Sequence, residues 1–246
     1  NIRDHSKFTC IRGLVEDVRL FGYYGGIRLL KAAIKRFVDY CNERGIELHD
    51  RNFSIRYDSN IPHLVGLAGS SAIITACLRA LMAFYGVTIP KPDLANLILS
   101  VETDELGISA GLQDRVAQVY QGLVYMDFSE SLLKGRGYGE YVPLDVGLLP
   151  PLYIAYRADL SEGSEVVHNN MRARFNRGDR AVLDAVAFWA DLTDKVRELL
   201  VSGRGAEIGV LLDANFDRRA AVCAISEANQ RMIDAARSVG ASAKFT

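Results

Sequence analysis

The sequence has almost no net charge and no long apolar run. Its 29 lysine and arginine residues nearly balance its 30 aspartate and glutamate residues, which leaves a net charge of −1. Nucleic-acid-binding domains usually carry a basic excess, so this balance argues against that class. No apolar segment reaches the roughly 18 residues that a membrane-spanning helix needs, and there is no signal-peptide pattern. We therefore expect neither a nucleic-acid nor a membrane partner.

Cysteine and histidine are scarce, and neither forms a cluster in the sequence. The cysteines are Cys10, Cys41, Cys77 and Cys223, and the histidines are His5, His49, His63 and His168. No two of them have the spacing of a zinc site, and the cysteines do not form a disulfide framework. We therefore expect reduced thiols in a cytoplasmic protein. The oligomeric state is not encoded in any pattern that we recognise.

Several well-known functional motifs are also missing. The chain has no Gly-Lys-Ser/Thr sequence, which excludes a P-loop, and no G-x-G-x-x-G sequence opens a βαβ unit. At its main glycine-rich turn it also lacks the G-x-S-x-G nucleophile elbow, which argues against a serine hydrolase. Any phosphate site must therefore be built differently.

Hydrophobic periodicity divides the chain into a mixed α and β part and a helical part. Residues 1–24 are expected to be irregular. The predicted helices of the first part cover residues 27–45, 72–86, 92–106 and 112–122, and its predicted strands cover residues 53–59, 122–128, 140–145 and 151–157. From about residue 164 to the end, the pattern is helical. The sequence therefore predicts an α+β protein with two lobes, residues 1–157 and residues 158–246.

The most informative segment is NIPHLVGLAGSSA, residues 60–72, where a glycine and serine turn enters an apolar helix. Gly66 and Gly69 permit backbone turns that side chains would block. Ser70 or Ser71 can cap the helix, and a helix N-terminus favours an anion. A serine oxygen can also bind Mg²⁺. The turn fits both a phosphate cradle and a plain helix cap, and the helix, charged only at Arg79, is expected to be buried.

The segment PHLVGLAGSSA resembles the second motif of the GHMP kinases, which is P-x-x-x-G-L-G-S-S-A-A. The matching residues are Pro62, Gly66, Leu67, Gly69, Ser70, Ser71 and Ala72. Two positions depart from the motif, because Ala68 is an extra residue and Ile73 replaces an alanine. Further segments, among them LGISAGLQDRVAQVYQGLVYMDFS and ARSVGASAKFT, look like the plant-type glucuronokinase branch, so that the resemblance covers most of residues 22–246.

The resemblance implies a two-lobed GHMP-kinase fold and an ATP- and Mg²⁺-dependent sugar kinase that acts on the anomeric hydroxyl of D-glucuronate. The alternatives are a kinase for galacturonate, galactose or a heptose, and a non-catalytic sensor of sugar and nucleotide. In the family, a first motif precedes and a third follows the region that this chain spans. The chain is therefore expected to be an excerpt, in which the first lobe lacks its first strands and the second lobe lacks its last strands. If residues 1–246 are instead the whole protein, we expect weak or no activity.

The resemblance also assigns site residues. The loop formed by Gly66, Leu67, Ala68, Gly69, Ser70 and Ser71 would wrap the ATP phosphates. Ser71 and Glu102 would bind Mg²⁺, with Asp104 and Glu105 close enough to leave that choice open. Asp114 would face the attacking hydroxyl. Taken alone, Glu102 could be a solvated helix residue, and Asp114 could be a helix N-cap.

A sugar carboxylate is best bound by an arginine fork. The candidates are Arg115, Arg172, Arg174, Arg218 and Arg219, and Tyr23, Tyr24, Gly25 and Gly26 could line the sugar pocket. From these and the loop before Asp114, the predicted substrate residues are Tyr23, Gly111, Arg115 and Arg219. Most surface arginines form ordinary ion pairs, so an ion pair is the alternative role for each arginine candidate.

Overall fold

The computed structural model describes residues 6–25, 27–62, 65–156 and 171–245. The chain divides into two compact units. The first contains Asn1–His63 and Leu67–Val142, and the second contains Leu64–Gly66 and Pro143–Thr246. The predicted boundary between residues 157 and 158 lies outside the described residues and stays a prediction.

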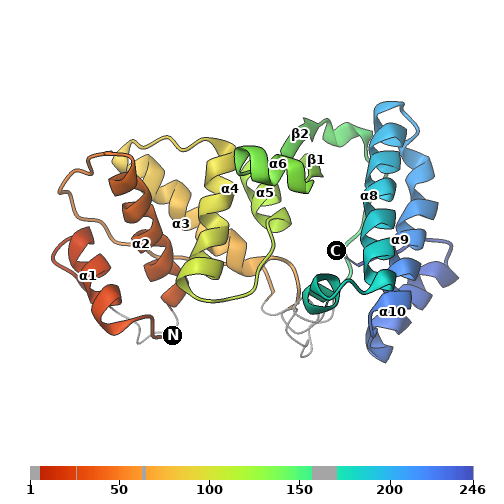
Figure 1. Ribbon diagram of the computed structural model, residues 1–246, viewed down its shortest axis with the longest axis horizontal. Helices are drawn as coiled ribbons and strands as arrows, with labels where there is room; N and C mark the ends of the chain where they lie inside the picture. Colours follow the sequence, from red (N-terminus) through yellow and green to blue (C-terminus); the bar gives the residue numbers. More distant parts are fainter. Residues whose placement is uncertain (1–5, 26, 63–64, 157–170, 246) are drawn as a thin grey trace. The chain divides into compact units, whose positions relative to one another are not determined.

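The first unit is mostly helical and includes one small sheet (Figure 1). Its elements are α1 (Ile11–Phe21), α2 (Arg28–Glu43), α3 (Gly69–Tyr85), α4 (Lys91–Ser100), a π-helical turn (Val101–Glu105), α5 (Gln113–Tyr120), β1 (Leu123–Asp127), α6 (Glu130–Arg136) and β2 (Glu140–Leu144). Strands β1 and β2 pair with each other, and β2 runs across the boundary between the units. The structure therefore contains the helices predicted over residues 27–45, 72–86, 92–106 and 112–122. It also contains the strands predicted over residues 122–128 and 140–145.

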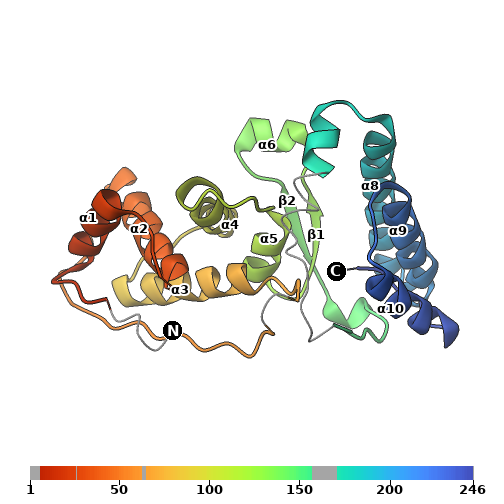
Figure 2. The ribbon, with the colours of Figure 1, turned by 90° about the horizontal axis from the view of Figure 1, so that it is seen from below.

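The core of the first unit lies between α2, α3 and α4, which pack side by side (Figures 1 and 2). On α2, Ala33, Phe37 and Cys41 recur every four residues and are fully buried. That spacing places them on one face of a helix. Leu78 of α3 and Ile98 of α4 are likewise fully buried. This packed core is the support on which the turns before α3 and α5 are mounted.

Helix α3 is less enclosed than its composition predicts. Ile74, Leu78 and Leu81 are buried, but Ala76 and Ala80 are exposed, as is Ala83. Burying a methyl group yields far less free energy than burying a leucine side chain. An alanine can therefore remain in solvent at little cost, and an apolar helix in sequence still has an open face in space.

Three local expectations are corrected. Residues 1–24 are not irregular throughout, because α1 buries Leu14, Val15 and Val18 along one face. Residues 53–59 and the described part of 151–157 form no strand. Alternating apolar residues make a strand only when a neighbouring strand supplies hydrogen bonds, which the local sequence does not specify.

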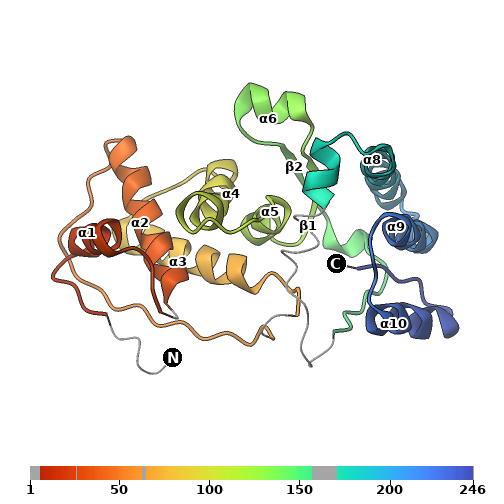
Figure 3. The ribbon, with the colours of Figure 1, turned by 60° about the horizontal axis from the view of Figure 1, so that its bottom comes forward.

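The second unit is helical along most of its described length (Figure 3). A short 3₁₀ turn (Val146–Leu148) is followed by a helix over residues 171–176, by α8 (Arg180–Val201), by a 3₁₀ turn (Gly205–Ile208), by α9 (Gly209–Val222) and by α10 (Glu227–Ser238). Helix α8 packs against α9, and Trp189 Nε1 donates to the Asn215 carbonyl at 3.3 Å. Arg237 of α10 pairs with Asp213 of α9 at 3.0 Å. The predicted helical character of this part is confirmed for its described residues.

Within the described part of the chain, no helix combines the length and apolarity needed to cross a membrane.

Candidate active site

The turn before α3 owes its shape to two left-handed backbone positions. Gly66 has φ 77° and Ala68 has φ 53° and ψ 34°. Glycine adopts this conformation freely, but in alanine it costs roughly 1–2 kcal/mol. Ala68, the extra residue of the motif, is the N-cap of α3. The insertion is therefore accommodated by one strained residue at the mouth of the helix.

The two serines do not cap α3, contrary to the expectation from sequence. Ser70 and Ser71 lie inside the helix, and the N-cap residue makes no side-chain hydrogen bond. Ser71 is completely buried, and its Oγ donates to the Ala68 carbonyl at 2.9 Å. The N–H groups of the first turn consequently receive no bond from an N-cap side chain, which leaves the anion-binding character of this terminus intact.

The second part of the site lies between the π-helical turn and the start of α5. Glu102 is only 3% exposed and Arg115 only 4%. Arg115 Nη2 donates to Glu102 Oε2, and Arg115 Nη1 donates to the Gly111 carbonyl at 2.9 Å. Nη1 also lies 3.4 Å from Asp114 Oδ2. One guanidinium group therefore joins Glu102, Gly111 and Asp114, which are three of the residues predicted from sequence.

The environment of these charged groups is uneven. Burial lowers the pKa of Arg115, and among the described residues its buried Nε has no hydrogen-bond partner. The Asp114 side chain, in contrast, is 51% exposed. Asp114 is the second residue of α5, whose N-cap is Leu112, so it is not the N-cap that the sequence alternative envisaged. Glu102 is buried, so it is not the solvated helix residue that its own sequence alternative envisaged.

Helix α5 is held by its buried face and at its C-terminal end. Val116 is fully buried in the core. At the C-terminal end, Arg79 of α3 donates to the carbonyls of Gln118 and Val119 at 2.8 and 3.3 Å. These bonds satisfy carbonyls that a helix end leaves without intrahelical partners. Arg79 therefore ties α5 to α3, and Asp114 projects from a firmly held helix.

Comparison with known proteins identifies the family. Residues 28–122 match the model of the GHMP kinases N terminal domain. The chain is 44% identical to "Probable glucuronokinase 2" of Arabidopsis thaliana and 42% identical to "Glucuronokinase 1" of the same plant, over 99% of the chain and 68% of each relative. The chain belongs to the GHMP kinase family.

A solved structure supports the GHMP-kinase fold that the sequence predicts. The D-glycero-D-manno-heptose 1-phosphate kinase from Bacteriodes thetaiotaomicron superposes with a TM-score of 0.52 at 17% identity. The match covers 78% of this chain, which spans about half, 54%, of the length of that solved chain. At this identity the likeness concerns the fold alone.

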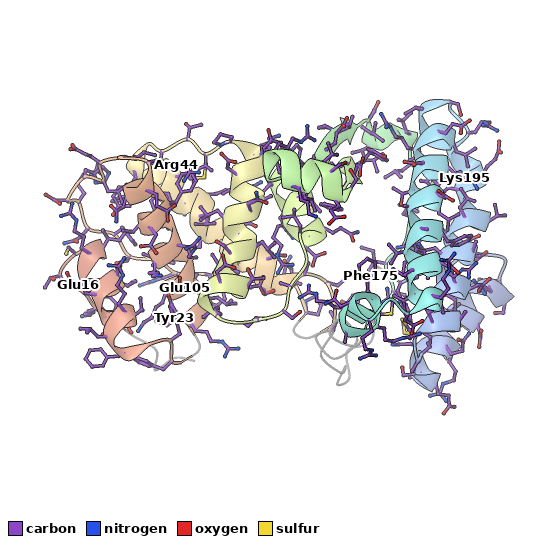
Figure 4. The ribbon with its side chains drawn as sticks, in the orientation of Figure 1. Glu16, Tyr23, Arg44, Glu105, Phe175 and Lys195 are labelled. Carbon is purple, nitrogen blue, oxygen red and sulfur yellow. The ribbon has the colours of Figure 1, made fainter. Side chains whose placement is uncertain are left out.

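The three acidic residues that competed in the sequence for one role have separate partners in this GHMP kinase. Glu102 pairs with Arg115, and the exposed Asp104 accepts from Thr103 Oγ1 at 2.7 Å. Glu105 accepts from Tyr23 at 2.8 Å and from Lys35 Nζ at 2.7 Å. Figure 4 shows Tyr23 and Glu105 beside each other in the first unit. Of the three, only Glu102 shares a hydrogen-bond partner, Arg115, with Asp114 in the contacts described above.

The contacts of Tyr23 and Lys35 were not foreseen from sequence. Burial raises the pKa of the Tyr23 hydroxyl, and its hydrogen bond to Glu105 raises it further. For Lys35, burial acts to lower the pKa, but hydrogen bonds to Glu105 and Asp39 outweigh burial and raise it. Both donors therefore keep their protons, and the Tyr23 hydroxyl donates its hydrogen bond to a carboxylate of its own chain. No motif pointed to this network, although Lys35 and Asp39 have the i, i+4 spacing of a helical ion pair.

The remaining arginine candidates belong to the second unit. The Arg219 guanidinium carbon lies 5.4 Å from the centre of the Phe245 ring, and that of Arg218 lies 4.7 Å from the Phe188 ring. Arg174 pairs with Asp179 at 2.7 Å. Gly26, which was considered for the sugar pocket, lies outside the described residues.

Ser71 and Glu102 do not form an open magnesium site in this structure. Ser71 is completely buried with its hydroxyl hydrogen directed to a carbonyl, and Glu102 is paired with Arg115. The described residues also contain no group of three or more histidine, cysteine, aspartate or glutamate side chains that could hold a metal ion. Mg²⁺ usually keeps several waters and binds through one or two carboxylates and substrate phosphates. The residues predicted as ligands therefore do not fit a cation bound by the protein alone.

Proposed function

We propose that this protein is an ATP-dependent sugar kinase that phosphorylates the anomeric hydroxyl of D-glucuronate to give glucuronate 1-phosphate. The observation that carries the proposal is the arrangement around Asp114. This half-exposed carboxylate stands in the first turn of α5, and a buried arginine lies within hydrogen-bonding distance of it. The near full-length similarity of the chain to two proteins named as glucuronokinases supports the substrate.

In this proposal, the loop of residues 66–71 binds the ATP phosphates. The left-handed turns at Gly66 and Ala68 allow backbone N–H groups to approach phosphate oxygens, and the α3 N-terminus adds its dipole. Mg²⁺ would arrive as the companion of ATP and neutralise charge on its phosphates. Gly66 has no side chain and Ala68 has only a methyl group, so both leave room for the close approach that a phosphate cradle requires.

Asp114 would face the anomeric hydroxyl. That oxygen forms the new bond to the γ-phosphorus, the bond between the γ-phosphorus and the bridging oxygen breaks, and ADP leaves. The hydroxyl proton passes to the Asp114 carboxylate or to water, depending on whether Asp114 acts as a base or only orients the hydroxyl. Phosphoryl transfer depends mainly on positioning and charge neutralisation, so either role gives a large rate effect.

Arg115 is poorly suited to bind the sugar carboxylate, and the role of Arg219, a residue of the second unit, stays a prediction. The two terminal nitrogens of Arg115 already bond to Glu102 and Gly111, and its side chain is buried. A substrate carboxylate would have to displace these partners. Gly111, which offers backbone and no side chain, is proposed to line the pocket next to Asp114.

A panel of sugars with coupled detection of ADP tests this function. Turnover of glucuronate above galacturonate, galactose and heptoses is the expected result. Turnover of a neutral sugar without turnover of glucuronate would contradict the uronate assignment. Binding of sugar and ATP without ADP release would instead favour the non-catalytic sensor.

A further inference from the structure

Arg115 links groups from three places in the first unit. Its guanidinium reaches Glu102 on the π-helical turn, the Gly111 carbonyl in the segment before α5, and Asp114 in the first turn of α5. Only a planar fork with several donors can serve three acceptors in fixed directions at once. The contact with Asp114 is the longest of the three and leaves that carboxylate half exposed.

Stability alone is a poor explanation for this arrangement. Burying a charged pair removes two ions from water, and their attraction often only repays that loss. Here the cost of removing the guanidinium group from water is not fully offset, because Arg115 Nε is buried without a partner among the described residues. Well-packed apolar residues in place of such a pair are often as stable or more stable. The pair is thus better explained by what it positions.

We propose that Arg115 is a positioning residue that orients Asp114 towards the sugar hydroxyl, and that Glu102 is the internal counter-ion of Arg115 rather than a magnesium ligand. This inference rests on the proposed function, since it concerns the residue that faces the sugar. A metal ion bound by Glu102 would compete with Arg115 for the carboxylate. Losing that partner would leave a buried guanidinium ion unpaired, which is strongly unfavourable.

A kinetic double-mutant cycle between Arg115 and Asp114 tests the positioning role. We expect Arg115→Met to lower kcat by about 100-fold, the size of effect that a misplaced catalytic group produces. ATP affinity, measured by calorimetry, should stay within about threefold, since the loop of residues 66–71 is unchanged. In a protein that already carries Asp114→Ala, Arg115→Met should change kcat by less than about threefold, because its effect runs through Asp114. Equal losses of kcat in both backgrounds would overturn the inference, as would an unchanged kcat in Arg115→Met alone.

Two further variants keep the test valid if Arg115→Met folds poorly. Glu102→Leu combined with Arg115→Met removes both charges, so it should unfold at a temperature close to that of the unchanged protein and still lose kcat. Arg115→Lys keeps the charge without the fork, and it should recover only part of the lost kcat. Full activity in the folded double variant would contradict the inference. Arg19→Met, which removes a surface ion pair with Asp39 in the same unit, is the matched control and should leave kcat unchanged.

Glu102→Gln separates a counter-ion from a metal ligand. Calorimetry of Mg²⁺–ATP binding should give an affinity within about threefold of the unchanged protein if Glu102 only pairs with Arg115. A loss of roughly 10-fold or more, as even indirect metal partners produce, would overturn this half of the proposal. The kinetic cycle uses whichever sugar the unchanged protein phosphorylates. Failure on glucuronate with success on another sugar would therefore refute the proposed substrate and leave the positioning role to be decided by the cycle.

Discussion

The turn before α3 and the start of α5 are built in opposite ways. Before α3, the backbone carries the special geometry, with Gly66 and Ala68 in left-handed conformations and the Ser71 hydroxyl bonded locally. At the start of α5, charged side chains carry it, because Arg115 joins Glu102 to Asp114. The first segment should therefore be sensitive to backbone freedom, and the second to charge and to the shape of the guanidinium group.

The largest effect should come from the charged segment. Asp114→Ala removes the carboxylate that we place at the sugar hydroxyl, and we expect kcat to fall roughly 1,000-fold, within the range of general acid–base contributions. ATP affinity should change by less than about threefold, since the loop of residues 66–71 is untouched. Steady-state kinetics and calorimetry measure the two quantities. Glu43→Ala, an exposed acid of α2, is the control, and substantial turnover by Asp114→Ala would sink the role of this residue.

A smaller effect is expected from the backbone segment. Gly66→Val places a branched side chain where φ is 77°, which costs about 1–2 kcal/mol or distorts the loop. We expect the ATP KM to rise about 10-fold while kcat at saturating ATP falls little. Gly86→Val is the matched control, because Gly86 has φ 66° at the opposite end of α3. That variant should lose stability without changing the ATP KM, and equal KM changes in both would argue against a phosphate loop at Gly66.

The smallest effect concerns the extra residue of the motif. Ala68→Gly relieves a left-handed alanine, and we expect the free energy of unfolding to rise by about 1 kcal/mol. Ala72→Gly, a few residues later and inside the helix, should instead lower it by about 1 kcal/mol. Urea denaturation of both variants gives the comparison. If the two substitutions change stability in the same direction, Ala68 is not strained in the folded protein.

Sequence and structure agree best where local pattern decides the outcome. The spacing of Ala33, Phe37 and Cys41 indicates α2, and the Gly66–Ser71 text indicates a turn entering a helix. The pairing of Arg115 with Glu102 could not be predicted, because it depends on how the π-helical turn and α5 are packed in space. For the same reason, the sequence could not decide which of Glu102, Asp104 and Glu105 would bind Mg²⁺. The structure distinguishes the three residues by their separate partners.

Segments that depend on distant neighbours are the ones that sequence misjudged. Residues 53–59 alternate as a strand does, yet they remain irregular and pair with no strand among the residues that the structure describes. Helix α1 is the exception, because Leu14, Val15 and Val18 follow a helical spacing that the local sequence already contains. Ser71 looked like a cap or a metal contact by residue type, but its hydroxyl is satisfied by the carbonyl of Ala68. Residue type suggested these roles, and three-dimensional context decided them.

The most direct test of the account is to identify the phosphorylated product. Phosphorus NMR of a reaction containing the protein, Mg²⁺–ATP and D-glucuronate should show a new sugar phosphate whose phosphorus couples to the anomeric proton. The same signal should be lost when Asp114→Ala replaces the unchanged protein. A phosphate attached at any other carbon, or ADP formed without a sugar phosphate, would contradict the claim that this chain directs phosphoryl transfer to the anomeric hydroxyl.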